Sequence, residues 1–168
     1  VLRRKKKFPR LELVEGNFAL AETAARVGPV DAALFFNVLL HQVKPDWDET
    51  LRNWAGHVRH FVVYNQQYTG PETVRFVNMG REEYFRYVPA DASMENFKEL
   101  FERPDEPHPF YADGRPYRDM HAVWQWGITD ADLRRVMAEL GFREAYYENC
   151  GAWPGVEMIE NHAFMFSG

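Results

Sequence analysis

An amide and an imidazole side chain occur near the end of an apolar run, VDAALFFNVLLHQV, at residues 30–43. They belong to Asn37 and His41. A histidine, with an ordinary pKa of about 6.5, can take a proton from a hydroxyl or amine nucleophile. A buried amide needs hydrogen-bond partners, which a ligand can supply. The alternatives are a structural amide and a loop histidine bonded to the backbone, so both residues are candidates for a site.

Two other stretches place polar side chains after an apolar segment. GNF at residues 16–18 ends the segment RLELVEG, and YNQQY at residues 64–68 follows FVVY. The carboxyl ends of parallel strands meet at one edge of a sheet, where α/β proteins bind their ligands. We therefore expect these amides to lie at the same edge as Asn37, with His41 just beyond it.

Strands and helices alternate in the part of the chain that must position these side chains. The patterns predict strands at residues 10–16, 32–40 and 61–64, and helices at residues 19–28 and from residue 46 onward. The middle strand, AALFFNVLL, is apolar without alternation, which is typical of a strand buried on both faces. Asp46 is the expected cap of the second helix. The alternation predicts an α/β fold with a mostly parallel sheet.

The rest of the chain contains an insertion and a regular C-terminal part. Residues 69–125 are rich in proline and aromatic residues, and we interpret them as an insertion with short helices at residues 81–88 and 94–101 that covers the strand ends. A helix is predicted at residues 129–141, where Thr129 and Asp132 resemble a capping box. Strands at residues 142–150 and 161–167 follow. The whole chain, residues 1–168, is predicted to form a single domain.

Composition limits the partners that the sequence suggests. The net charge is −5 and the pI is about 5.7, so nothing calls for nucleic acid. The basic run RRKKK at residues 3–7 is a solvated end or a phosphate-binding arm. No apolar stretch has the ~18 residues of a membrane span. The lone Cys150 favours a reducing, cytoplasmic setting.

One histidine pair has a spacing that metal sites use. In HVRH, His57 and His60 would share a face of the predicted helix. No carboxylate or cysteine lies nearby to complete a coordination shell. We therefore predict no metal site.

The order of the motifs resembles the class I S-adenosylmethionine-dependent methyltransferases. LELVEGNF is similar to the family's third strand, VDAALFFNVLLHQV to its fourth strand and loop, and HFVVYNQQ to its fifth strand. GITDADLRRVMAELGFREAYYENC resembles the last helix and the strand after it, and ENHAFMFSG resembles the antiparallel seventh strand. The resemblance covers about two-thirds of the chain. It implies a Rossmann-like sheet that is mostly parallel, with an antiparallel C-terminal strand.

The resemblance also implies roles for individual residues. S-adenosylmethionine would be held by Gly16, Asn17, Phe18, Phe36 and Asn37. His41 would be the catalytic base, and a small-molecule acceptor would contact Tyr64, Asn65, His121, Trp124 and Trp126. Structural alternatives stand beside these roles: Asn17 as a cap of the helix that follows, Phe18 as core, and the stretch DMHAVWQWG at residues 119–127 as core packing.

The sequence departs from the family at its N-terminal side. It contains neither the glycine-rich turn that follows the family's first strand nor the acidic residue that ends the second. We therefore expect an incomplete sheet and weak or absent binding of the cofactor to this polypeptide alone. Two hypotheses follow: a methyltransferase, truncated or degenerate, that acts on a small molecule, and a non-catalytic binding or assembly domain that has lost its cofactor.

The departure also has a consequence for assembly. The strand AALFFNVLL would lack its neighbour on one side and would expose an apolar edge. Unpaired edges of this kind invite pairing with another chain. We expect a homodimer that covers this edge, unless the segment LELVEG closes the sheet within one chain.

Overall fold

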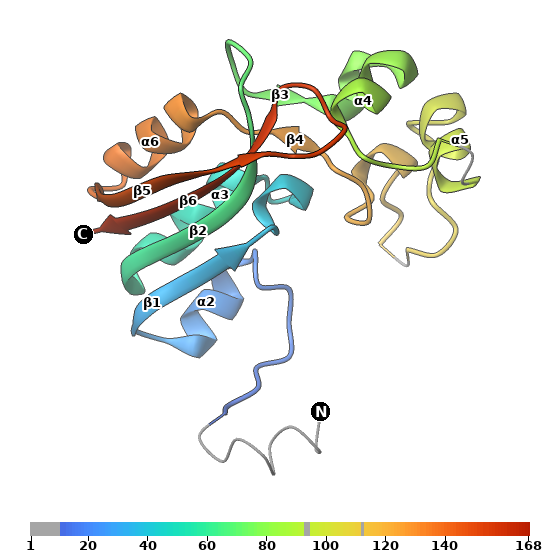
Figure 1. The fold of residues 1–168 in the computed structure, drawn as a ribbon. Helices are drawn as coiled ribbons and strands as arrows, with labels where there is room; N and C mark the ends of the chain where they lie inside the picture. The colour runs from blue at the N-terminus through green and yellow to red at the C-terminus, as the bar shows by residue number, and fades with distance from the viewer. Residues whose placement is uncertain (1–10, 93–94, 112) are drawn as a thin grey trace.

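The computed structural model describes residues 11–92, 95–111 and 113–168 (Figure 1). Its α-helices are α2 (Ala21–Val27), α3 (Trp47–Ala55), α4 (Arg81–Tyr87), α5 (Glu95–Glu102) and α6 (Asp130–Glu139). Its strands are β1 (Val30–Phe36), β2 (Val58–Tyr68), β3 (Val74–Arg75), β4 (Trp126–Gly127), β5 (Arg143–Ala152) and β6 (Ile159–Ser167). Short 3₁₀ turns lie at Leu39–His41 (η1), Phe76–Met79 (η2) and Tyr117–Asp119 (η3).

The main sheet has the order β1-β2-β6-β5. β1 pairs with β2 in parallel, and β6 is antiparallel to both of its neighbours. The fold is therefore mixed α/β, with a parallel start and an antiparallel C-terminal return, as the sequence predicts. The long register between β2 and β6, from His60 opposite Ser167 to Tyr68 opposite Ile159, fixes the C-terminal strand in the middle of the sheet.

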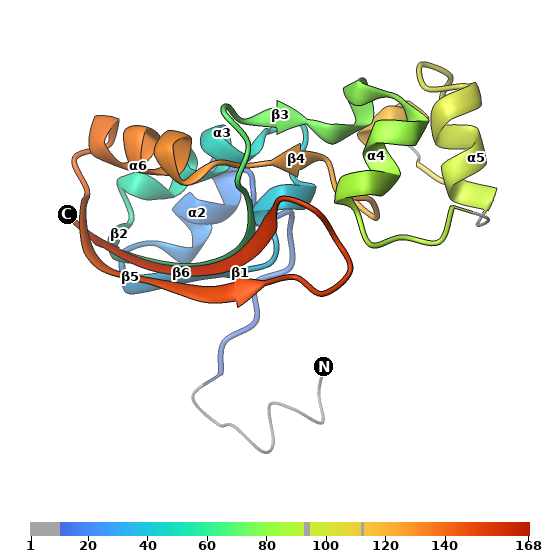
Figure 2. The ribbon, with the colours of Figure 1, turned by 45° about the horizontal axis from the view of Figure 1, so that its top comes forward.

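Helices cover one face of this sheet. Figure 2 shows α2, α3 and α6 on the same side. Phe35, Phe61 and Phe164 point to that side and pack with Trp54 and Leu133 in the main core. On the opposite face, no helix of the described residues covers β1. The sheet thus has one packed face and one open face.

The open face corrects the prediction that the apolar strand is buried on both sides. Leu34 and Phe36 of β1 are 61% and 54% exposed, whereas Phe35 between them is buried. Apolar composition identified the strand but could not show which face lacks a cover.

The prediction of a strand at residues 10–16 is also wrong for the residues that the structure describes. Residues 11–16 run without strand structure, and residue 10 lies outside the described residues. Leu13 is exposed. A strand needs a neighbour for its backbone N–H and C=O groups, and no described strand lies beside this segment.

β2 is longer than predicted and changes two interpretations. α3 ends at Ala55, with Gly56 as its C-cap, and β2 starts at Val58. Val58 and His60 therefore belong to a strand and not to the helix. It continues to Tyr68, so YNQQY is strand and not a loop beyond it. Asp46 occupies the N-cap of α3, but its carboxylate accepts from the Lys44 backbone N–H at 3.4 Å and bonds no N–H of the helix.

The segment between β2 and α6 forms a lobe beyond the strand ends, with its own apolar cluster around Phe76, Tyr84 and Leu100. Figure 1 shows α4 and α5 in this lobe. Both helices were predicted, although residue 94, the expected start of α5, lies outside the described residues. β3 and β4 form a separate two-stranded sheet in which Val74 pairs with Gly127, and the Tyr68 N–H at the end of β2 donates to the Ile128 carbonyl just after β4 at 2.8 Å.

α6 begins at the predicted cap, with one modification. Thr129 Oγ1 accepts from the Asp132 backbone N–H at 3.3 Å. The reciprocal bond of a capping box goes instead to Thr73, whose backbone N–H donates to Asp132 Oδ2 at 3.0 Å. The lobe thereby contributes to the start of α6. None of the helices in the described ranges has the length and apolar character needed to cross a bilayer.

Candidate functional site

Two loops position His41. The residues after β1 form the turn η1, and residues 121–126 form a second loop that runs beside it. The Gln125 backbone N–H donates to the Leu40 carbonyl at 2.9 Å, and Trp126 Nε1 donates to the Gln42 carbonyl at 2.7 Å. His121 Nε2 lies 3.2 Å from the Val43 carbonyl. The hydrogen bonds from Gln125 and Trp126 fix the backbone on both sides of the imidazole.

The His41 ring is itself held by the second loop. Its Nδ1 lies 2.7 Å from the Val123 carbonyl oxygen. A carbonyl oxygen can only accept, so Nδ1 carries the proton and Nε2 of the neutral ring carries the lone pair. The described residues offer Nε2 no hydrogen bond. The arrangement leaves one basic nitrogen in a fixed orientation.

Burial lowers the pKa of His41, the Val123 hydrogen bond opposes this, and the charge of His121 lowers it further. The pKa therefore lies below its ordinary value of about 6.5. At neutral pH the ring is uncharged and can accept a proton. This is the protonation state that a general base requires.

His41 lines a cavity of about 420 Å³ between η1, the end of α4 and the second loop. Most of the lining is apolar or aromatic, with Val88, Phe97 and Trp124 as examples, and it also includes Asp91. A volume of this size falls in the range of small-molecule sites, which are mostly apolar with a few polar groups. The cavity therefore suits a small organic molecule with a polar atom directed at His41.

Tyr84 of α4 lines the same cavity. Its side chain is 0% exposed, and its hydroxyl has no hydrogen-bond partner among the described residues. Burial raises the pKa of Tyr84 far above the usual range. The backbone N–H of Trp124 opposes this shift, but it does not form a hydrogen bond with the phenol oxygen. The phenol therefore stays protonated.

One peptide group lies next to both polar side chains. The bond between Val123 and Trp124 directs its carbonyl to His41 and brings its N–H close to the Tyr84 oxygen. The sequence did not single out Tyr84. Its spacing with Tyr87 and Val88 on one helical face indicates burial, but no sequence signal shows that a buried hydroxyl lacks a partner.

Three other residues of the second loop were predicted to contact the acceptor, and only one of them lines this cavity. Trp124 lines it and meets Trp153 edge-to-face at 6.0 Å. His121 contacts Arg115 Nη1 at 2.7 Å, and burial and the Arg115 charge lower its pKa. Trp126 donates to the Gln42 carbonyl, so its indole N–H is occupied. The structure thus brings His41 and Trp124 together, with Trp126 supporting the backbone next to them and His121 bonded to Arg115.

Tyr64 and Asn65 are neighbours in β2 and so point to opposite faces of the sheet. Tyr64 pairs with Phe36 on the open face, whereas Asn65 is buried on the helix-covered face. The Asn65 amide donates to the Gln66 carbonyl at 2.9 Å, and its Oδ1 has no partner among the described residues. Neither residue lines the cavity that contains His41.

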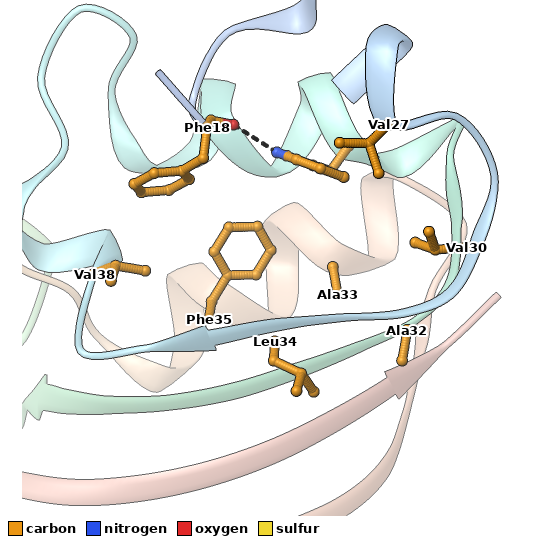
Figure 3. A pocket seen from close by; sticks show the side chains of 9 residues that line it. Phe18, Val27, Val30, Ala32, Ala33, Leu34, Phe35 and Val38 are labelled. Atoms are coloured by element: carbon orange, nitrogen blue, oxygen red, sulfur yellow. Dashed lines mark hydrogen bonds between the residues drawn. The ribbon is translucent and has the colours of Figure 1, made fainter. Parts of the chain in front are cut away.

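Two of the predicted cofactor residues have structural contacts. Asn17 Oδ1 accepts from the Ala19 backbone N–H at 3.0 Å in the turn before α2. The Phe18 ring packs on Phe35, with ring centroids 6.2 Å apart. Figure 3 shows the two rings and the hydrogen bond that the Phe18 carbonyl accepts from Trp54 Nε1 at 2.8 Å. Asn17 thus has a structural contact in the turn before α2, whereas the partly buried Phe18 ring both packs on the core and lines a cavity beside β1.

The remaining predicted cofactor residues lie at the carboxyl end of β1 and before α2. Asn37 has a positive φ of 52°, and its Oδ1 is buried without a partner in the described part of the chain. Phe36 is exposed on the open face. Gly16 lies against Thr23 of α2. One unsatisfied amide oxygen does not make a site for an adenosyl sulfonium, so the described residues do not fit S-adenosylmethionine on their own.

The two histidines of HVRH lie in different elements and do not share the helical face that the sequence predicts. His57 lies in the turn after α3, and His60 lies in β2, where its Nδ1 is 3.0 Å from Ser167 Oγ. No cluster of three or more His, Cys, Asp or Glu side chains suited to a metal occurs in the ranges that the structure describes.

A first prediction concerns Asn17. Replacement by alanine should lower the free energy of unfolding by about 1 kcal/mol, because the turn before α2 loses a side-chain acceptor. Urea denaturation measures the change. Asn17→Asp retains an acceptor oxygen and should remain close to wild type; equal losses in both variants would contradict the turn role.

Comparison with known proteins concerns the fold. No family model matches the sequence, and no curated protein sequence matches it. Among solved structures, the mitomycin 7-O-methyltransferase MmcR aligns with a TM-score of 0.52 and 14% identity, over 99% of this chain and 36% of that chain. The N-terminal domain of EvdMO1, crystallised with SAH and D-fucose, aligns with a TM-score of 0.46 and 13% identity over 88% of this chain and 52% of that chain. LepI in complex with SAM aligns with a TM-score of 0.43 and 11% identity over 99% of this chain and 39% of that chain.

The MmcR alignment shows that the chain has a methyltransferase-like fold. The chain spans little more than a third of that protein. At 14% identity the similarity extends to the fold alone, so activity has to be argued from the cavity and its side chains.

Proposed function

We propose that this chain is a methyltransferase-like domain that binds a small hydroxylated acceptor, with His41 as its general base. The observation that carries this proposal is the hydrogen bond from His41 Nδ1 to the Val123 carbonyl. It orients the lone pair of Nε2 in a mostly apolar cavity of about 420 Å³. The methyltransferase-like fold supports the reaction class.

In the proposed site, an acceptor hydroxyl donates to His41 Nε2 and transfers its proton there as its oxygen becomes a nucleophile. The Val123 carbonyl then stabilises the charged ring through the Nδ1–H. Trp124 restricts the acceptor on one side of the cavity.

A second prediction concerns the methyl donor. Calorimetry should detect weak or no binding of S-adenosylmethionine to the 168-residue chain, because Asn17 and Phe18 have structural contacts and the sequence contains no glycine-rich turn. Micromolar affinity would contradict this expectation. It would mean that the ends of β1 and β2 suffice to hold the donor.

A non-catalytic binding domain is the second candidate. The contact that Asn17 makes in the turn before α2 favours it, because the amide predicted to bind adenine then has a structural role. The two candidates share the cavity and differ in whether a methyl group is transferred. For either candidate we propose a reducing, cytoplasmic setting, because the exposed Cys150 forms no disulfide.

The deciding experiment supplies the donor in excess. The chain is incubated with millimolar S-adenosylmethionine that carries an isotope-labelled methyl group and with simple phenols, and the products are analysed by mass spectrometry. Labelled aryl methyl ether that is lost with His41→Gln supports the methyltransferase. Binding of the phenols without any labelled product supports the non-catalytic domain.

A further inference from the structure

We propose that the Tyr84 hydroxyl is a recognition group and that the cavity selects a phenol carrying a carbonyl oxygen on the same aromatic body. This deepens the proposed function, since it rests on His41 taking the acceptor hydroxyl. The new element is a second polar contact from α4, in the lobe between β2 and α6.

The first step is the state of the Tyr84 side chain. Its hydroxyl is fully buried, and no described group accepts its proton. A buried donor without a partner destabilises a folded protein unless a ligand or water completes it. Its pKa is raised by burial, so the group remains a donor at neutral pH. A ligand oxygen that accepts is its chemical complement.

The second step is the direction of the two polar groups. The Trp124 N–H approaches the Tyr84 oxygen from the peptide whose carbonyl holds His41. The Tyr84 hydroxyl has no hydrogen-bond partner among the described residues, so its O–H can still donate. His41 offers the opposite function, because Nε2 accepts. A ligand that satisfies both must donate from one atom and accept at another.

The third step is the body of the ligand. Besides His41 and Tyr84, the cavity is lined by Phe97, Trp124, aliphatic side chains that include Val88, and Asp91. Aromatic rings prefer stacked or edge-to-face contacts with other rings. A flat aromatic body with a hydroxyl for His41 and a carbonyl for Tyr84 therefore fits the lining and both polar groups.

The test measures binding of three small probes to the full chain, without a methyl donor, by titration calorimetry or ligand-observed NMR. 4-Hydroxyacetophenone has the hydroxyl and the carbonyl, 4-ethylphenol lacks the carbonyl, and acetophenone lacks the hydroxyl. We expect 4-hydroxyacetophenone to bind up to about tenfold more tightly than 4-ethylphenol, the gain typical of one neutral hydrogen bond. This comparison needs no variant.

Two variants of α4 assign the effect. Tyr84→Phe should abolish the preference for the carbonyl and should leave the thermal midpoint equal or higher, because it removes an unpartnered buried hydroxyl. Tyr87→Phe, one turn along the same helix and outside the cavity lining, should retain the preference. Equal affinities for 4-hydroxyacetophenone and 4-ethylphenol in the wild type, no binding of either, or an unchanged preference in Tyr84→Phe would overturn the inference.

These outcomes are separate from those of the methyl-transfer experiment. Labelled methyl transfer to 4-ethylphenol and 4-hydroxyacetophenone alike would preserve the proposed function and refute the role of Tyr84. A carbonyl preference that Tyr84→Phe removes, without any transfer, would preserve the role of Tyr84 and refute the enzyme.

Discussion

Replacing His41 by glutamine should lower the rate of methyl transfer to a phenol by a factor of about 10² to 10⁴, the usual contribution of a general base. Glutamine can still donate an amide N–H to the Val123 carbonyl, so the second loop should keep its position. It has no group that can take the acceptor proton. Initial rates with labelled donor at a fixed millimolar concentration measure the effect.

His57→Gln is the matched control, because His57 lies in the turn after α3 and does not line the cavity. It should transfer methyl groups at the wild-type rate. If His41→Gln retained more than about a tenth of the wild-type rate, proton removal by this ring would not be the step that the protein accelerates.

The pH dependence provides a second check on His41. Its pKa is lowered chiefly by burial and further by His121, so the ring is neutral above a value that lies below about 6.5. A base acts in its neutral form, and the transfer rate should therefore rise with pH through this lowered pKa and then become constant. His41→Gln should lack that rise. A rate that fell over the same range would require a protonated His41.

The free energy of unfolding should also rise with pH through the lowered pKa of His41. The unfolded chain binds a proton near pH 6.5, whereas the folded chain binds it only at lower pH, so the unfolded state binds more protons in between. The contribution of the neutral ring is complete above about pH 6.5 and is lost as the pH falls through the folded pKa. His121 has the same direction of shift and contributes in the same window.

The position of His41 beyond a strand end could be predicted because it follows from apolar patterning alone. The orientation of its ring could not, since it depends on Val123, which is 82 positions away in the sequence and belongs to the loop that ends the inserted segment. Tyr84 could be predicted as buried, but its missing partner is a property of the assembled cavity. Local patterns locate such residues, and long-range contacts determine their chemistry.

The failures in the fold have the same origin. Residues 11–16 alternate as a strand does, but a strand forms only beside another one. β1 is apolar on both sides, yet only Phe35 is buried, because the helices cover a single face. In both places the sequence indicates a sheet larger than the one that the described residues form.

The two edges of the sheet differ in a way that bears on assembly. β5 is protected against further pairing, because it has charged side chains such as Glu144 and Glu148 and two register shifts against β6. β1 has a regular register with β2, and Asp31 is its only charged residue. The edge at β1 therefore lacks the usual protection.

The β1 edge also has the geometry for a further strand. In a parallel ladder, alternate residues direct their N–H and C=O groups to each side, and the Val30 N–H bonds the carbonyl of His57, just before β2. Asp31, Ala33 and Phe35 therefore direct theirs to the free edge. Beside them lies an apolar cavity of about 350 Å³, which Figure 3 shows between Phe18, Val27 and β1.

We propose that a second copy of this chain covers the edge through a two-fold axis near Ala33. Antiparallel pairing would place Ala33 opposite its own copy and Asp31 opposite Phe35, so the three outward residues satisfy one another. The small side chains of Ala32 and Ala33 allow close approach at the axis. On the open face, the exposed Leu34 of each copy would pack against Ala32 of the other.

Light scattering should therefore report a particle of about twice 19.8 kDa, and Leu34→Lys should raise the dimer dissociation constant by about tenfold or more. Leu34 suits the test because it is exposed, whereas a charge at Phe35 would enter the core and unfold the chain. Tyr146→Lys on the protected β5 edge is the control and should leave the dimer intact, because general surface hydrophobicity would respond to both substitutions. A monodisperse monomer of the wild-type chain at high concentration would refute the dimer, because it would show that the β1 edge remains unpaired.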